Sequence, residues 1–112
     1  MNFNISKVKI VVTAPIEVAE EIRLALGGTV AGIIGNYSNC TVSMECIGTF
    51  KGNNESNPVL GTKNQLEIVK EKKIEVQCNI SKAKSVIELL RKIHPYEEPV
   101  IDIIPLINEN DL

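Results

Sequence analysis

The decisive stretch of this sequence is a short polar one, His94-Pro95-Tyr96-Glu97-Glu98-Pro99. It holds the only histidine, one of the two tyrosines and two of the five prolines of the 112-residue chain. Because each proline biases the residue before it away from helix, this 94–99 segment is a stiff bend that displays polar side chains. Two interpretations stay open, a plain turn from a helix to a strand and part of a functional site.

The residues on either side of the segment predict a helix before it and a strand after it. Ser81 suits the N-cap of the helix, and apolar residues then recur at helical spacing: Ala83, Val86, Ile87, Leu90 and Ile93. The apolar run over residues 100–106 predicts the strand. Residues 107–112 are mostly polar, and we expect them to form a frayed tail.

The first part of the chain predicts a strand, a helix and two further strands. Residues 5–13 alternate in polarity, with Val8, Ile10 and Val12 on one face. Pro15 suits the first turn of the helix that follows, and Gly27-Gly28 ends that helix. Strands over residues 41–51 and 66–78 flank a long polar connection, residues 52–65, which we expect Val59 and Leu60 to pin onto the core.

The order strand, helix, strand, strand, helix, strand predicts an α+β fold, the ferredoxin-like βαββαβ sandwich, in which two helices cover one face of an antiparallel sheet. We expect residues 1–112 to form one domain, with a core over about residues 5–106 and the tail 107–112 outside it. The strand directions place the 94–99 segment beside residues 14–15 and the 52–65 connection. They place residues 32–37 at the opposite end, where we expect Gly35 or Asn36 to adopt a positive φ angle.

Composition and charge exclude several kinds of partner. The hydrophobic content of 44% and the charged content of 23% are those of a globular domain. The net charge of -2 argues against nucleic acid, and the basic residues 70–73 are interleaved with Glu71 and Glu75, which indicates a solvated strand face. Since no apolar run reaches the length of a membrane span and no secretion signal is visible, we expect a cytoplasmic protein without nucleic-acid or membrane partners.

The three cysteines, Cys40, Cys46 and Cys78, are odd in number and lack Cys-x-x-Cys spacing. They therefore predict neither a disulfide framework nor a structural zinc site. We expect buried, inert thiols. Cys40 lies near Tyr37 and is a conceivable nucleophile, but no base lies near it in the sequence.

His94, Glu97 and Glu98 are candidate ligands of a divalent metal ion, because imidazole and carboxylate suit zinc, copper or nickel. The alternative is structural: His94 bonds a backbone carbonyl while Tyr96 packs at a subunit contact. Neighbours in an extended segment point to opposite sides, so Glu97 and Glu98 do not form an acid–base pair, and we assign no catalytic residue. A ligand-binding or interface role is predicted for a wider set: Gly35, Asn36, Tyr37, Cys40, His94, Tyr96, Glu97 and Glu98.

Five blocks occur in order along the chain: Ala31-Gly32-Ile33-Ile34-Gly35-Asn36-Tyr37, Gly48-x-Phe50, Pro58-x-x-Gly61, Glu67-x-Val69-x-Glu71 and the 94–99 segment. Together they resemble the YqfO-like domain of the Nif-three-like family, which occurs as an insert and as a free-standing small protein. The end of the chain is also similar to CutA, the divalent-cation-tolerance protein. Both groups have a ferredoxin-like fold related to PII signalling proteins, so the resemblance implies that fold and a homotrimer. Asn64 stands where the family usually has glycine, and asparagine tolerates the left-handed backbone that such a position uses.

The larger Nif-three-like proteins carry a two-metal site on lobes that flank this domain. One histidine cannot reproduce a cluster of several histidines and carboxylates, so we do not transfer their hydrolase chemistry to this chain. Three classes of function stay open: a small oligomeric binding or sensory module, PII-like, for a metal ion or a small molecule; a structural oligomerisation or protein-interaction module; and an enzyme. A divalent metal ion is the only cofactor that the sequence brings into consideration.

Overall fold

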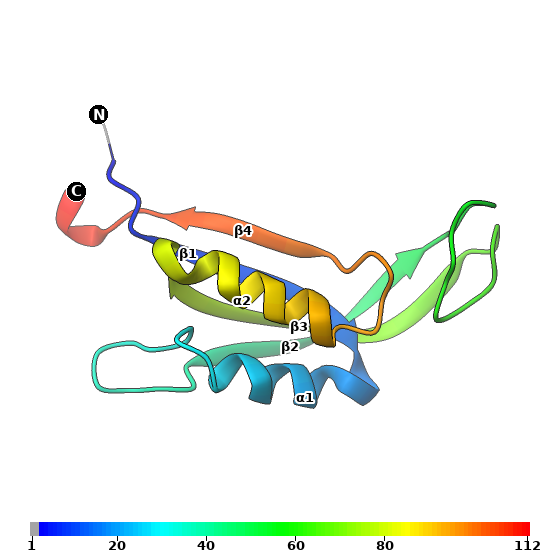
Figure 1. The fold of residues 1–112 in the computed structure, drawn as a ribbon, viewed down its shortest axis with the longest axis horizontal. Coiled ribbons are helices and arrows are strands. Elements are labelled where there is room, and N and C mark those ends of the chain that lie inside the picture. Colours follow the sequence, from blue (N-terminus) through cyan, green and yellow to red (C-terminus); the bar gives the residue numbers. More distant parts are fainter. Residues whose placement is uncertain (1–2) are drawn as a thin grey trace.

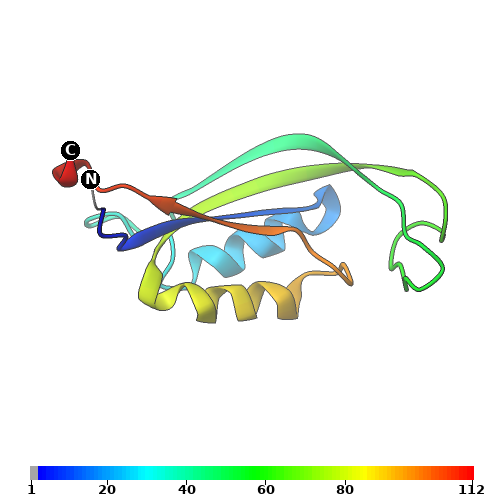
Figure 2. The same cartoon turned by 90° about the horizontal axis from the view of Figure 1, so that it is seen from above.

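A computed structural model describes residues 3–112; residues 1–2, which the expected domain includes, lie outside the described residues. The elements follow in the predicted order: β1 (Lys7–Pro15), α1 (Ile16–Gly27), β2 (Thr41–Phe50), β3 (Glu67–Asn79), α2 (Ile80–Ile93) and β4 (Ile101–Leu106). The strands form one antiparallel sheet in the order β2-β3-β1-β4. Both helices lie on one face of it (Figures 1 and 2), which confirms the predicted ferredoxin-like sandwich.

The core lies between the helices and the sheet face that they cover. Alternate residues of β1 and β3 point into it, as the period of two predicted, and their side chains are buried. The helices contribute residues at spacings of three and four: Ala19, Ile22, Leu26, Ala83, Val86 and Leu90. Since full burial of one Leu, Ile or Val side chain is worth about 1.5–3 kcal/mol, this layer is the main source of the fold's stability.

Two details differ from the sequence prediction, one at the start of α2 and one in the C-terminal tail. The N-cap position of α2 is Asn79 and not Ser81, and no side chain caps it. The first helical N–H, that of Ile80, instead donates to the carbonyl of Ser6 at 2.9 Å, so the strand supplies the acceptor. The tail is not simply frayed either: Glu109–Asp111 form a 3₁₀ turn, in which the Asn108 side chain accepts from the Asn110 N–H at 2.9 Å.

The β2–β3 hairpin extends beyond the rest of the sheet as a two-stranded arm. β1 pairs with β3 only from Glu71 onward, so the preceding residues of β3 pair with β2 alone. Figure 2 shows this arm passing beyond both helices toward the 52–65 connection. Ile47 and Ile68 on the arm are 71% and 70% exposed. A two-stranded ribbon of this kind has little stability of its own, because it lacks a third strand or a covering helix.

The two polar loop regions lie at opposite ends of the domain, as predicted (Figure 1). The 94–99 segment shares one end with the β1–α1 junction and the arm. Residues 28–40 occupy the other end, where the start of β1 and the C-terminal 3₁₀ turn also lie. There Ile34 and Tyr37 exchange backbone hydrogen bonds of 2.9 and 3.0 Å around a tight turn. Gly35 takes a φ angle of 58° in this turn, which confirms the expected positive φ.

Candidate ligand-binding site

His94 fixes the start of the 94–99 segment by two hydrogen bonds. Its side chain is buried, with Nε2 2.7 Å from the Thr13 carbonyl oxygen and Nδ1 3.1 Å from the backbone nitrogen of Tyr96. A carbonyl can only accept and a backbone N–H can only donate, so Nε2 carries the proton and the ring is neutral. The predicted bond from His94 to a backbone carbonyl is confirmed, while the predicted packing of Tyr96 at a subunit contact stays a prediction.

These bonds bear on the predicted metal site at His94, Glu97 and Glu98. Both ring nitrogens of His94 are engaged, so no lone pair is free for a cation in this conformation. Glu97 accepts from the backbone N–H of Asn57 at 2.8 Å. Across residues 3–112, no three His, Cys, Asp or Glu side chains gather as a metal site. Metal binding at these residues stays a prediction. It requires one ring nitrogen of His94 to give up its present hydrogen bond before it can bind a metal ion.

Tyr96 joins the segment to the sheet through Glu71. The Tyr96 hydroxyl donates to Glu71 Oε2 at 2.9 Å, and Glu71 is only 6% exposed. The expectation of a solvated strand face over residues 70–73 is therefore wrong for Glu71. The reason is that Glu71 lies opposite Cys46, on the sheet face away from the helices by strand alternation, and the Tyr96 side chain contacts it there. A Cβ at Gly48 would overlap the Glu71 carboxylate, so glycine there leaves room for this buried side chain.

The protonation states around Glu71 follow from burial and charge. Burial, reinforced by the hydrogen bond to the Glu71 carboxylate and by its charge, raises the pKa of the Tyr96 hydroxyl far above its ordinary value. Burial and the nearby Glu71 charge also raise the pKa of the Cys46 thiol. Tyr96 therefore remains a donor at neutral pH, and Cys46 remains a thiol and not a nucleophilic thiolate.

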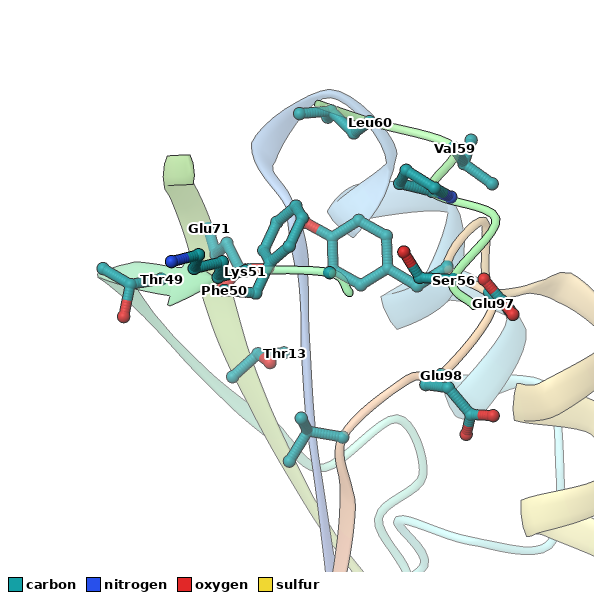
Figure 3. Close-up of a pocket in the computed structure, with 14 residues that line it drawn as sticks. Thr13, Thr49, Phe50, Lys51, Ser56, Val59, Leu60, Glu71, Glu97 and Glu98 are labelled. Carbon is teal, nitrogen blue, oxygen red and sulfur yellow. The ribbon is translucent and has the colours of Figure 1, made fainter. Parts of the chain in front are cut away.

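A cavity of about 250 Å³ opens beside the Tyr96–Glu71 pair. The end of β2, the 52–65 connection, Glu71 and the 94–99 segment enclose it, and Phe50 and Tyr96 line it with their rings 5.8 Å apart and tilted by 57°. Figure 3 shows Val59 and Leu60 on one side of this cavity and Glu97 and Glu98 on another. The cavity is thus mostly apolar, with a few carboxylates at defined places.

The 52–65 connection is held in place by hydrogen bonds and not by packing into the core. Val59 and Leu60, expected to pin it to the core, are 68% and 38% exposed and line the cavity instead. The backbone N–H of Asn64 donates to the Gly52 carbonyl at 2.6 Å and closes the loop. Asn64 has a φ angle of 64°, so asparagine does occupy the left-handed region as expected, and Gly61 does so at 87°.

The structure brings together only part of the residue set predicted for ligand binding. The 94–99 segment, which contains His94, Tyr96, Glu97 and Glu98, lies at one end of the domain, and the 28–40 region, which contains Gly35, Asn36, Tyr37 and Cys40, lies at the other. Tyr37 is 76% exposed. Within one chain the two groups form no common site, and the role of the second group stays a prediction.

The expectation of three buried thiols holds for one cysteine only. Cys78 is buried, while Cys40 and Cys46 are partly exposed. Cys46 lies on β2, an edge strand, and faces away from the helices, so no second layer covers it. The Cys40 sulfur approaches the Ser38 carbonyl at 3.7 Å.

Sequence reasoning assigned no site role to Glu71 or Phe50, although both lie in the motifs quoted above. The available signal was Gly48, a glycine in the interior of a predicted strand, which indicates the close approach of another group. The sequence could not say which group approaches. Glu71 is 25 residues from Tyr96 in the sequence, and only the tertiary fold brings their side chains together.

The fold is that of the CutA proteins. CutA1 from the psychrotrophic bacterium Shewanella sp. SIB1 superimposes with a TM-score of 0.70 over 95% of this chain and 86% of its own, at 18% identity. A Bacillus cereus protein related to NIF3 is more similar, with a TM-score of 0.77 and 42% identity over 96% of this chain. A GTP cyclohydrolase 1 type 2 homolog of Halalkalibacterium halodurans is 43% identical over 103 residues.

These matches confirm the resemblance to the Nif-three-like proteins that the motifs predicted. The matched region is 92% of this chain but 28% of the Halalkalibacterium protein and 27% of the Bacillus cereus chain, so the chain corresponds to about a quarter of those relatives. No protein-family model matches the sequence. Within residues 3–112, no helix has the length and apolar character needed to cross a bilayer.

The Tyr96–Glu71 bond gives the first testable prediction, on Tyr96→Phe. At pH 7 the substitution leaves a buried carboxylate without its donor, and we expect the free energy of unfolding to fall by about 1–3 kcal/mol. The pKa of Tyr96 is raised in the folded state, so its contribution is complete below the unfolded-state pKa of about 10 and is lost as pH rises above it.

Urea unfolding at equal protein concentration, at pH 8 and pH 11, is the measurement. The difference between wild type and Tyr96→Phe should shrink at the higher pH, because the Tyr96 hydroxyl ionises in the unfolded wild type while it stays protonated beside Glu71 in the folded state, and this favours unfolding of the wild type only. All other side chains are common to the two proteins, so their contributions cancel in the difference. A difference that is near zero at pH 8, or that is the same at both pH values, contradicts the prediction.

Proposed function

We propose that this chain is a small binding module that holds a small molecule in the cavity between β3, the 52–65 connection and the 94–99 segment. The observation that carries the proposal is the buried Glu71 carboxylate on the wall of an otherwise mostly apolar cavity. Apolar concave sites with a few fixed polar groups are the usual form of small-molecule sites. At about 250 Å³, this one suits a ligand smaller than a typical drug.

The chemistry around the cavity supports binding more than reaction. A catalytic site needs a nucleophile or a base with an orienting partner. Tyr96 and Cys46 have raised pKa values and hold their protons at neutral pH. Glu97 is exposed and already accepts from a backbone N–H.

We also propose that the module is a homotrimer, as its family resemblance implies. The arm supports this, since its exposed Ile47 and Ile68 have no covering layer in one chain. The uncovered sheet face has a charged centre, where Glu75 contacts Lys9 at 3.5 Å and Lys73 at 3.6 Å. Exposed apolar side chains surround that centre: Val42, Met44, Val100 and Ile104. β2 and β4 also have open edges.

A trimer would bring the two predicted groups of site residues together. In one chain the 32–37 loop and the 94–99 segment lie at opposite ends. A neighbouring copy can place its loop, with Gly35, Asn36 and Tyr37, beside the 94–99 segment.

The exposed arm also favours a second candidate function, an oligomerisation module without a small ligand. A ligand-binding test and an assembly test separate the two candidates.

The binding proposal is tested by a thermal-shift panel of amino acids, amines, nucleotides and divalent metal ions. A ligand at a hundred times its Kd should stabilise the folded state by about 2.7 kcal/mol. Leu60→Trp fills the cavity mouth and should abolish the shift, whereas Leu24→Trp, on the exposed side of α1, should retain it. If no compound raises the Tm, or if Leu60→Trp responds like wild type, the cavity is not a binding site.

The assembly proposal is tested by light scattering at micromolar concentration. We expect three times the chain mass of 12.3 kDa. Ile68→Lys places a charge on the exposed arm and should weaken assembly by at least about tenfold, or 1.4 kcal/mol. The matched control, Leu24→Lys, should remain a trimer. A monomer mass for wild type refutes the trimer, and an intact trimer without any ligand in the panel supports the second candidate function.

A further inference from the structure

The Glu71 carboxylate has fewer partners than a buried charge requires. Within residues 3–112 its one hydrogen-bond donor is the Tyr96 hydroxyl, which binds Oε2. The ion pairs of the same residues involve Glu20 and Glu75, so no lysine or arginine pairs with Glu71. Burying a carboxylate is costly unless it is paired or well hydrogen-bonded. The site is therefore short of one cationic or donor group.

The second oxygen of Glu71, Oε1, can be reached from the cavity. Among the described residues, no fully enclosed side-chain oxygen or nitrogen lacks a hydrogen-bond partner. Oε1 has no protein donor, so it must retain contact with the space outside the protein atoms. Glu71 is 6% exposed and is one of the residues that line the cavity, and we infer that a ligand in the cavity can reach Oε1.

The charged side chains that line the cavity are mostly negative. Three carboxylates line it, those of Glu71, Glu97 and Glu98, against one ammonium group, that of Lys51. An anionic ligand would meet this excess of negative charge in a partly desolvated space, where repulsion is stronger than in water. A cationic ligand would be attracted by all three carboxylates.

The aromatic pair adds a second feature that fits an organic cation. Phe50 and Tyr96 lie with ring centroids 5.8 Å apart on the wall that also holds Glu71. A cation within about 6 Å of an aromatic face is attracted by the ring quadrupole, and an apolar body gains from contact with the same rings. Pro58, Leu60 and Val100 complete the apolar lining.

We propose that the ligand of this cavity is a small organic cation, an amine on an apolar body, whose ammonium group donates to Glu71 Oε1 while its body lies against Phe50 and Tyr96. This inference rests on the proposed binding function and specifies its ligand class. It differs from the metal prediction, because it uses Glu71 and not the nitrogens of His94.

Three probes of nearly equal size separate charge from shape: benzylamine, benzyl alcohol and benzoate. Each is titrated into ¹⁵N-labelled protein to millimolar concentration, and amide shifts of Thr13, Gly52 and Glu97 report occupancy of the cavity. We expect benzylamine to bind at least about tenfold more tightly than benzyl alcohol. Benzoate should bind most weakly.

Glu71→Gln removes the charge but leaves a side chain of the same shape that still accepts from Tyr96. We expect this variant to bind benzyl alcohol as wild type does and to lose most of the preference for benzylamine. Glu88→Gln, an exposed carboxylate of α2 away from the cavity, should keep the preference. A preference that survives in Glu71→Gln overturns the assignment to Glu71.

The remaining outcomes distinguish the inference of a cationic ligand from the proposed small-molecule binding function. Equal binding of benzylamine and benzyl alcohol overturns the cation inference and leaves the binding site intact. Absence of binding by all three probes overturns both. Dissociation of the assembly in Glu71→Gln, with no benzylamine binding by wild type, indicates that a cationic side chain of a second copy occupies Glu71, and this also overturns the inference.

Discussion

The hydrogen bond from the Tyr96 hydroxyl to the Glu71 carboxylate, at 2.9 Å, is the contact on which the candidate site depends. It attaches the 94–99 segment to the uncovered face of β3 and so forms one wall of the cavity. Gly48 makes the contact possible, since any Cβ at that position would displace the carboxylate. Without this bond, the buried carboxylate would lose its one hydrogen-bond donor among residues 3–112, and the 94–99 segment would lose this contact with β3.

His94 and Tyr96 fix different parts of the 94–99 segment. The bonds from His94 to Thr13 and from the Tyr96 N–H to His94 fix where the chain leaves α2. Each such bond contributes only about 0.5–1.5 kcal/mol net, but an unmet buried partner costs about 1–3 kcal/mol. The core therefore decides that the domain folds, while these few polar contacts decide the conformation of the segment and the shape of the cavity.

The fold could be predicted from the sequence because its determinants are local. The alternation of Val8, Ile10 and Val12 and the apolar stripe of α2 specify the elements, and their order leaves few topologies. The site could be predicted only in part, because its contacts are long-range: His94 and Thr13 are 81 residues apart. The 94–99 motif indicated His94, Tyr96 and Glu97. The burial of Glu71 was not predicted, because its lysine-rich sequence neighbours indicated a solvated strand face.

The energy of the Tyr96–Glu71 bond is measured most directly by a double-mutant cycle of Tyr96→Phe and Glu71→Ala on the free energy of unfolding, at fixed protein concentration. We predict that Tyr96→Phe is costly in the wild-type background and nearly neutral once Glu71 is alanine, with a coupling energy of about 1 kcal/mol or more. Effects that add within about 0.3 kcal/mol would show that the two side chains do not interact and would contradict the central claim.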